Sequence, residues 1–358
     1  MAKTNITTRI SRRTVSRAVY SGQESSVLTK YAVELGTTIF PYTNLVPVLE
    51  SPEDTGEIWW MASPAMLNIS STSDTPEAVV GRFARADREE VRPRGLPDYA
   101  KTSWSELTRI SHAIEVDTQT ELEPISKIMT QAELTEFLKR ELEYVVAYDL
   151  TRQLLNPSNY HSDFHLELSG EGAGAGNCWV LSSGAVNHDA RPLEDIVNGI
   201  NALRNRWGAY PIDIWMGAEA FKGLSCNQNV IMGLPTNTLR APVSEDIIKA
   251  YFASFGVANV YVVSDGYTIG EDPTRTENFV PFFGEEVYIG FTPNVTGNKI
   301  KSPASVVYIK RAGFEWLVTP YTINDRATVT GVRIDHFYQV FRNSSINYAG
   351  YLITNVRA

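Results

Sequence analysis

The sequence is short of cysteine and histidine. Its 358 residues include two cysteines, Cys178 and Cys226, and five histidines. Two thiols are too few for a disulfide scaffold or a four-cysteine zinc site, although a single disulfide between them stays open. A chain of this length buries about 75% of its unfolded surface, so its core needs no such staples. The cysteine content therefore favours a reducing compartment such as the cytoplasm.

Long hydrophobic runs are also missing. The most apolar long segment, residues 247–263, is interrupted by Lys249, Ser254, Gly256 and Asn259. A membrane span needs about 20 predominantly apolar residues. The N-terminus is basic but lacks the apolar stretch of a secretory signal. We therefore expect no membrane span, and we expect the chain to be used in the cytoplasm or assembled into something there.

The common signatures of catalysis are absent too. The sequence contains neither GxxxxGK[ST] nor GxSxG. In the run from 170 to 177 glycine takes every second position, which is not the GxGxxG spacing, so a loop is favoured over a dinucleotide site. His161 and His165 have a spacing that could ligate a metal on a helix, but Asn156–Pro157 just before them argues against a helix. No catalytic, cofactor-binding or metal-binding residue is predicted.

What is present is an ordinary globular composition with an uneven charge. Hydrophobic residues make up 43% of the chain and charged residues 20%, which excludes a disordered or fibrous protein. Residues 1–20 contain five basic residues and no acidic residue, a charge of +5. Because the total charge is −9, the other 338 residues carry −14. An acidic body argues against a general nucleic-acid binder. The basic segment is either an arm that docks on a subunit, an acidic scaffold or nucleic acid, or a frayed terminus.

The segment from Ser63 to Lys101 has little to bury. Serine, threonine, aspartate and proline come first, followed by charges of both signs. Loops this long are uncommon inside a compact domain and are functional or disordered when they occur. A long two-stranded excursion that packs on a neighbouring subunit would satisfy its backbone. A disordered insertion is the alternative, and residues 102–117 are the return path in either case.

Three helices are predicted from apolar spacing. The first begins near Met129 and ends before Asn156–Pro157; Leu134, Phe137, Leu138, Leu142, Val145 and Val146 form its expected apolar side. The second begins at Pro192, a favoured first helical position, and ends at Gly208. The third runs from Ser244 to Phe255, where Gly256 ends it.

Strands are predicted on both sides of these helices. Residues 57–62 combine adjacent aromatic side chains that suit a pleated sheet. Residues 212–216, 259–264 and 286–291 supply strands between and after the helices, and residues 304–356 are strand-rich. The stretch 191–292 is thus a mixed helix and strand unit, and the whole chain belongs to the α+β class.

The order of these elements resembles the major capsid proteins of tailed bacteriophages, which have the Hong Kong 97 capsid fold, and is most similar to the lambda-type major head proteins. The resemblance covers roughly residues 36–358. It is carried by seven stretches in collinear order: FPYTNLVPVLE (40–50), TSWSELTRISHAIEVD (102–117), TEFLKRELEYVVAYDLTRQLL (135–155), RPLEDIVNGINALRNRWGAYPIDIWMGAEAFKGL (191–224), EDIIKAYFASFGVANVYVVSDG (245–266), FVPFFGEEVYIGFTPN (279–294) and INYAGYLITNVRA (346–358).

The resemblance implies a division of the chain into parts. These are an N-terminal arm (1–55), an extended β-hairpin loop (56–113), a peripheral domain (114–189) with a long spine helix (129–156), an axial domain (190–320) and return strands to the peripheral domain (321–358). In this family the extended loop lies over an adjacent subunit, and the axial domain gathers around five-fold and six-fold axes.

The resemblance also implies a structural function and no enzyme activity. The chain would assemble with itself into hexamers and pentamers of an icosahedral shell around phage double-stranded DNA, in the cytoplasm of a bacterial host. A separate scaffolding protein and a portal would be its partners, with weak, non-specific contact to DNA; the binding of a decoration protein is left open by the sequence. Some relatives form a Lys–Asn cross-link; Lys101 is the only lysine within 56–113, but no motif fixes the asparagine, and no cross-link is predicted.

Two other functions stay open. An encapsulin, a nanocompartment shell with the same fold, would carry enzyme cargo, but a short extended loop is expected there. A cytoplasmic metal-dependent hydrolase would use His161 and His165.

Overall fold

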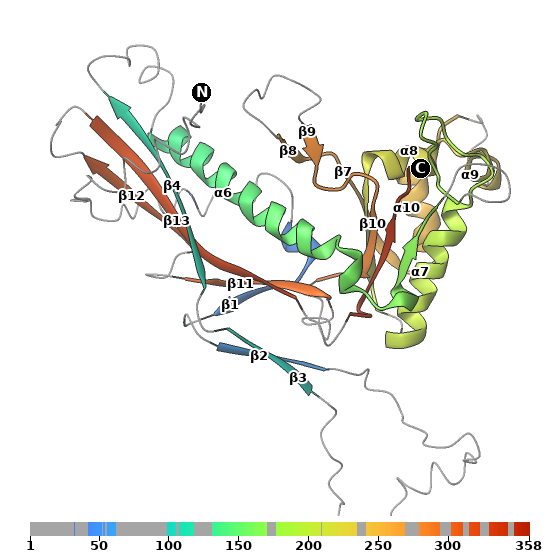
Figure 1. The fold of residues 1–358 in the computed structure, drawn as a ribbon, viewed down its shortest axis with the longest axis horizontal. Coiled ribbons are helices and arrows are strands. Elements are labelled where there is room, and N and C mark those ends of the chain that lie inside the picture. The colour runs from blue at the N-terminus through green and yellow to red at the C-terminus, as the bar shows by residue number, and fades with distance from the viewer. Residues whose placement is uncertain are drawn as a thin grey trace, which may run out of the picture.

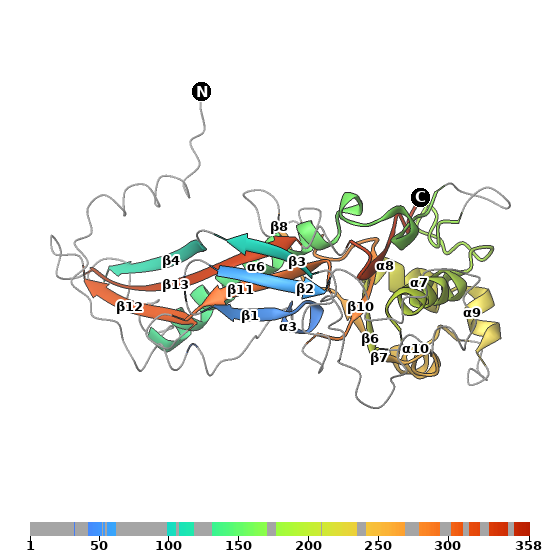
Figure 2. The ribbon, with the colours of Figure 1, turned by 90° about the horizontal axis from the view of Figure 1, so that it is seen from below.

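The computed structural model describes most of the chain between residues 42 and 358. The described residues are 32, 42–51, 53, 56–61, 99–104, 107–117, 131–169, 177–208, 210–234, 241–268, 279–293, 302–310, 315–322, 329–342 and 347–358. The basic N-terminal segment, most of the charged segment 63–101 and the glycine-rich run lie outside them. The described elements include two five-stranded sheets and two separate two-stranded hairpins (Figures 1 and 2).

The first sheet, here called the α6 sheet, is built around the 14-residue strand β13 (Val329–Arg342). One edge of β13 pairs with β4 (Thr108–Asp117). The other edge pairs first with β12 (Trp316–Thr322) and then with β11 (Ala304–Ile309), so these two strands follow each other along it. β1 (Val48–Ser51) adds to β11 in parallel, after the short helix α3 (Tyr42–Leu45).

The long helix α6 (Gln131–Leu154) lies across this sheet (Figure 1). It is the predicted spine helix, and its end at Leu154 is two residues earlier than expected. The helix ends because Pro157 begins a separate 3-10 turn, Pro157–Asn159, whose N-cap is the side chain of Asn156. Leu138 and Leu142 contact Trp316, Val318, Val332 and Ile334 of the sheet.

The second sheet, here called the central sheet, has the strand order β5-β14-β10-β6-β7. Its strands are β5 (His165–Glu167), β6 (Ile212–Gly217), β7 (Val257–Val263), β10 (Val287–Phe291) and β14 (Gly350–Thr354). Helices α7 (Pro192–Trp207), α8 (Ala218–Ser225), α9 (Gln228–Gly233) and α10 (Glu245–Ala253) lie on the side of this sheet that faces away from α6 (Figure 1).

The central sheet is buried on both faces, and its two faces belong to different hydrophobic clusters. Residues such as Ile214, Ile289 and Ile353 pack against α7 and α10 in one cluster. The alternate residues Trp215, Tyr288 and Leu352 join a second cluster with the C-terminal half of α6 and with β11 and β13. Because side chains alternate along a strand, three strands of one sheet hold the two halves of the molecule together.

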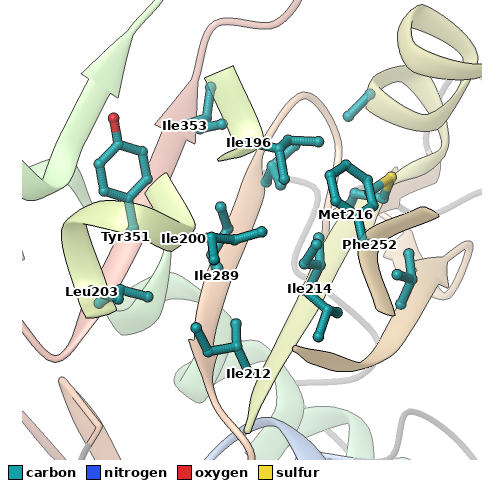
Figure 3. Close-up of a cluster of buried hydrophobic side chains, with 14 of the residues drawn as sticks. Ile196, Ile200, Leu203, Ile212, Ile214, Met216, Phe252, Ile289, Tyr351 and Ile353 are labelled. Carbon is teal, nitrogen blue, oxygen red and sulfur yellow. The ribbon is translucent and has the colours of Figure 1, made fainter. Parts of the chain in front are cut away.

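The apolar side of α7 packs against the central sheet. Ile196, Ile200 and Leu203 point from α7 toward the side chains of the sheet (Figure 3). Pro192 is the first helical residue, and Gly208 takes a positive φ of 86° at the C-cap, which favours glycine. The predicted second helix is confirmed at both ends.

The hairpin of β2 (Gly56–Met61) and β3 (Tyr99–Trp104) lies below the α6 sheet in Figure 1. Its strands pair antiparallel, with Met61 opposite Tyr99. The predicted strand 57–62 is therefore confirmed, shifted by one residue. The predicted excursion beyond Met61 lies outside the described residues. A second hairpin joins β8 (Gly266–Thr268) and β9 (Phe279–Pro281).

One other predicted element differs from the structure in its bounds. The third helix is shorter than expected, since β7 begins at Val257 directly after Gly256, which has a φ of 71°. The strands of the two sheets alternate along the chain: β11 lies in the α6 sheet, and β14 lies in the central sheet. The sheet that each strand joins is decided by long-range pairing, which local secondary-structure propensity does not encode. The division into peripheral and axial domains therefore stays a prediction in its residue ranges.

Candidate assembly surface

The outward side of α6 exposes large apolar side chains. Phe137 and Val145 are 43% and 44% exposed, and Tyr148 is 36% exposed. Phe279 on β9, the strand next to the C-terminal half of α6, is 46% exposed. Phe137 and Val145 were expected on the buried side, and that part of the prediction is wrong. Exposed apolar surface of this kind is typical of a protein–protein contact.

A groove continues this surface at the C-terminal end of α6. It has a volume of about 540 Å³ and lies between α6, the β8–β9 hairpin and residues 284–286. Tyr148 packs edge-on against Tyr267 with ring centroids 4.9 Å apart, and Tyr267 in turn contacts Phe282. These aromatic rings give the groove an apolar wall.

Charged groups lie beside the aromatic wall. The guanidinium of Arg152 lies 5.4 Å from the centroid of the Tyr148 ring, and its Nε donates to the Tyr148 hydroxyl at 3.1 Å. This bond raises the pKa of Arg152. Glu286 accepts hydrogen bonds from the backbone N–H groups of Gly284 and Glu285. Burial, followed by the nearby charge of Glu286, raises the pKa of Glu285. The groove thus combines an apolar wall with fixed charges, as interface rims do.

The two histidines with metal-ligand spacing have different partners. His161 caps a 3-10 turn, and its Nδ1 accepts from the backbone N–H of Asp163. His165 is on β5, and its Nε2 lies 2.9 Å from Oγ1 of Thr354. Burial lowers the pKa of His165. Within the described residues, no group of three or more His, Cys, Asp and Glu side chains is arranged to hold a metal ion.

Both cysteines are free thiols in the structure. Cys178 is buried in the cluster under α7, and Cys226 is partly exposed at the C-cap of α8. The single disulfide that the sequence left open is therefore not formed. Among the helices of the described residues, none is long and apolar enough to cross a membrane.

Comparison with solved structures identifies the fold. A phage-related protein from Bordetella bronchiseptica RB50 superposes with a TM-score of 0.64 at 16% identity, covering 94% of this chain and 98% of that one. A protein assigned as the capsid protein of a prophage in Escherichia coli CFT073 superposes with a TM-score of 0.51 at 11% identity, covering 93% and 99%. This chain has the Hong Kong 97 capsid fold. The sequence itself matches no family model and no curated protein.

Within the capsid fold, Lys101 lies on β3 opposite Trp59 of β2.

The helix expected to be the spine of the fold is α6, and the exposed apolar side of α6 is the feature that sequence reasoning missed. A signal was present in the spacing. Residues 134, 138, 142 and 146 repeat every four positions and are buried, whereas 137 and 145 lie off that row.

Proposed function

We propose that the chain is the major capsid protein of a tailed bacteriophage. It assembles with itself into hexamers and pentamers, and these form an icosahedral shell that encloses double-stranded DNA. The observation that carries this proposal is the extent of the structural likeness. The capsid fold accounts for more than nine-tenths of this chain and of both compared proteins.

The surface of the monomer supports assembly. Phe137 and Val145 on α6 and Phe279 on β9 are large apolar side chains that are 43–46% exposed. The β2–β3 hairpin lies apart from α6, below the α6 sheet in Figure 1. Contacts through two separate surfaces allow each copy to bind more than one neighbour, and many modest contacts then stabilise a closed shell.

The experiment is electron microscopy of the purified full-length protein, with sedimentation velocity over a range of salt and crowding conditions. The expected result is shells, or hexamers and pentamers that convert to shells. A monodisperse species of about the monomer mass of 39.9 kDa under all conditions would contradict the proposal.

The partners follow from the same proposal. A separate scaffolding protein sets the shell size, a portal occupies one vertex, and packaged DNA contacts this acidic chain only weakly. Expression of the chain alone tests the scaffolding requirement. Aberrant or mixed-size shells are expected, and efficient shells of one size would argue against a separate scaffold.

An encapsulin-type compartment is the second candidate. The segment between Met61 and Tyr99 favours the phage capsid, because a short extended loop is expected in a compartment. The two functions differ in content. Shells purified from the native host are expected to contain DNA, whereas stoichiometric enzyme cargo would favour the compartment.

A further inference from the structure

The N-terminal half of α6 contacts both edge regions of the α6 sheet through charged groups. Ile334 in the middle of the sheet pairs with His112 of β4 on one side and with Val318 of β12 on the other. β4 and β12 therefore flank β13, with α6 packed over it. Charged side chains of α6 reach toward both flanks.

On the β12 side, α6 buries an ion pair. Lys139 Nζ lies 3.5 Å from Glu143 Oε1, and both side chains are at most 4% exposed. The ammonium group also lies 5.7 Å from the centroid of the Trp316 ring, the first residue of β12. The ring of His336 on β13 stacks on Trp316 at 4.1 Å. Taking two charges out of water is costly, so small changes in the local charge balance have large effects here.

Glu315 adds a second carboxylate to this region. The Nδ1–H of His336 donates to the backbone oxygen of Glu315 at 3.1 Å, which holds this residue beside the buried pair. Lys139 is paired with Glu143, and the charges of both residues also act on the Glu315 carboxyl group. The other nearby lysine, Lys310, is already paired with Glu50 of β1 at 2.6 Å on the exposed surface. A proton on Glu315 therefore balances the charge.

The electrostatics agree with this geometry. Burial raises the pKa of Glu315 to about 7; Lys139 and Lys310 oppose the shift, whereas Glu143 and Glu50 add to it. His336 does not titrate in the same range, because burial lowers its pKa to about 4. Near neutral pH, Glu315 is thus the group beside the buried pair that changes charge.

On the β4 side, His112 holds α6 through a second titratable contact. Its Nε2 lies 2.8 Å from Glu141 Oε2, with both side chains about half exposed. The hydrogen bond to Glu141 raises the pKa of His112 above 6.5, against the opposing effect of burial. This contact is also strongest when the residue from the sheet carries its proton.

We propose that α6 is held on its sheet by a proton-dependent clamp, which loosens when Glu315 and His112 lose their protons and lets the helix shift relative to the sheet. The clamp consists of His112, Lys139, Glu141, Glu143, Glu315 and His336. Both titrating groups bind protons more tightly in the folded protein, so their stabilisation is present at low pH and is lost as pH rises through neutrality. The proposal does not depend on the capsid function.

Hydrogen exchange measured by mass spectrometry on the full-length protein tests the clamp. After correction for the intrinsic exchange rate, protection of α6 and β12 should fall roughly tenfold between pH 6 and pH 8.5, the effect of one group with a pKa of about 7. Protection of β14 in the central sheet should change much less. Equal protection of α6 and β12 at both pH values would overturn the proposal.

Two variants assign the effect. Glu315→Gln is uncharged at every pH, so it should keep α6 protected at pH 8.5, while Glu136→Gln on the exposed side of α6 should follow the wild type. A Glu315→Gln protein with the wild-type pH response would overturn the role of Glu315. If that variant does not fold, His112→Gln replaces a half-exposed side chain and should reduce the pH response of α6; an unchanged response would overturn the two-sided clamp.

Discussion

Gly199 of α7 and Tyr351 of β14 approach each other so closely that there is no room for a side chain. A Cβ atom at Gly199 would lie 2.7 Å from Cδ1 of Tyr351 and 2.8 Å from Cδ1 of Ile289. Glycine in a helix costs about 1 kcal/mol relative to alanine. The chain therefore carries a helix-weakening residue where the helix meets the sheet.

Gly199→Leu should lower the free energy of unfolding by about 2 kcal/mol or more, because overpacking of this contact outweighs the gain in helix propensity. Denaturant unfolding of the dissociated protein measures the change. Gly233→Ala is the matched control, since a Cβ there meets no atom within 4 Å. Equal stability of the two variants would show that α7 can move away from the sheet at little cost.

The buried Lys139–Glu143 pair predicts a non-additive response. Lys139→Met should cost about 3–5 kcal/mol, because it leaves the Glu143 carboxylate buried without its cation. The double variant Lys139→Met/Glu143→Leu should recover most of that loss. Arg140→Met breaks the half-exposed pair with Glu136 and should cost no more than about 1 kcal/mol. Additive losses in the double-mutant cycle would refute the coupling.

His336 predicts sensitivity to acid. Burial lowers its pKa to about 4, so the unfolded chain binds a proton that the folded protein excludes. Stability from this group is present above pH 6.5 and is lost as pH falls toward 4. The wild type should lose about 2 kcal/mol more than His336→Phe between pH 6.5 and pH 4.5. Unfolding midpoints at the two pH values measure this, with the half-exposed His161 replaced by Gln as the control.

The exposed side of α6 predicts an assembly defect without a folding defect. Val145→Lys places a charge on an apolar surface that is 44% exposed, so the monomer should keep its circular dichroism spectrum and its unfolding midpoint. Shell formation, followed by light scattering, should fall at least tenfold. Asn201→Lys adds the same charge to the exposed side of α7 and should assemble normally. Normal assembly of Val145→Lys would exclude this surface from the contacts.

Local sequence signals predict the ends of those helices whose first or last residues are themselves helix-starting or helix-stopping residues. Pro192 and Gly208 bracket α7, and Asn156–Pro157 stops α6 within two residues of the expected end. The burial of Lys139 and Glu143 was beyond such signals, because an i,i+4 pair of opposite charge is usually found on a solvated face. Its burial depends on Trp316 and His336, which follow Lys139 by 177 and 197 residues in the chain.

The short helices and the candidate surface were missed for related reasons. α8 follows β6 without a connecting loop, and α9 has only six residues, so neither supplies a long periodic pattern. Spacing alone groups Phe137 and Val145 with the buried row, because apolar residues occur on two sides of α6. Only the position of the sheet shows which side is covered.

The alternation of side chains along β10 has a consequence for how this molecule can change. Ile289 packs in the cluster under α7, and its neighbour Tyr288 packs in the cluster beside α6. Inserting one amino acid into β10 would turn every later side chain of the strand to the opposite face of the sheet. The packing of both hydrophobic clusters would then be disrupted. Length variation among natural relatives should therefore be confined to the connections, and β10 should keep its five residues even where every side chain has been replaced.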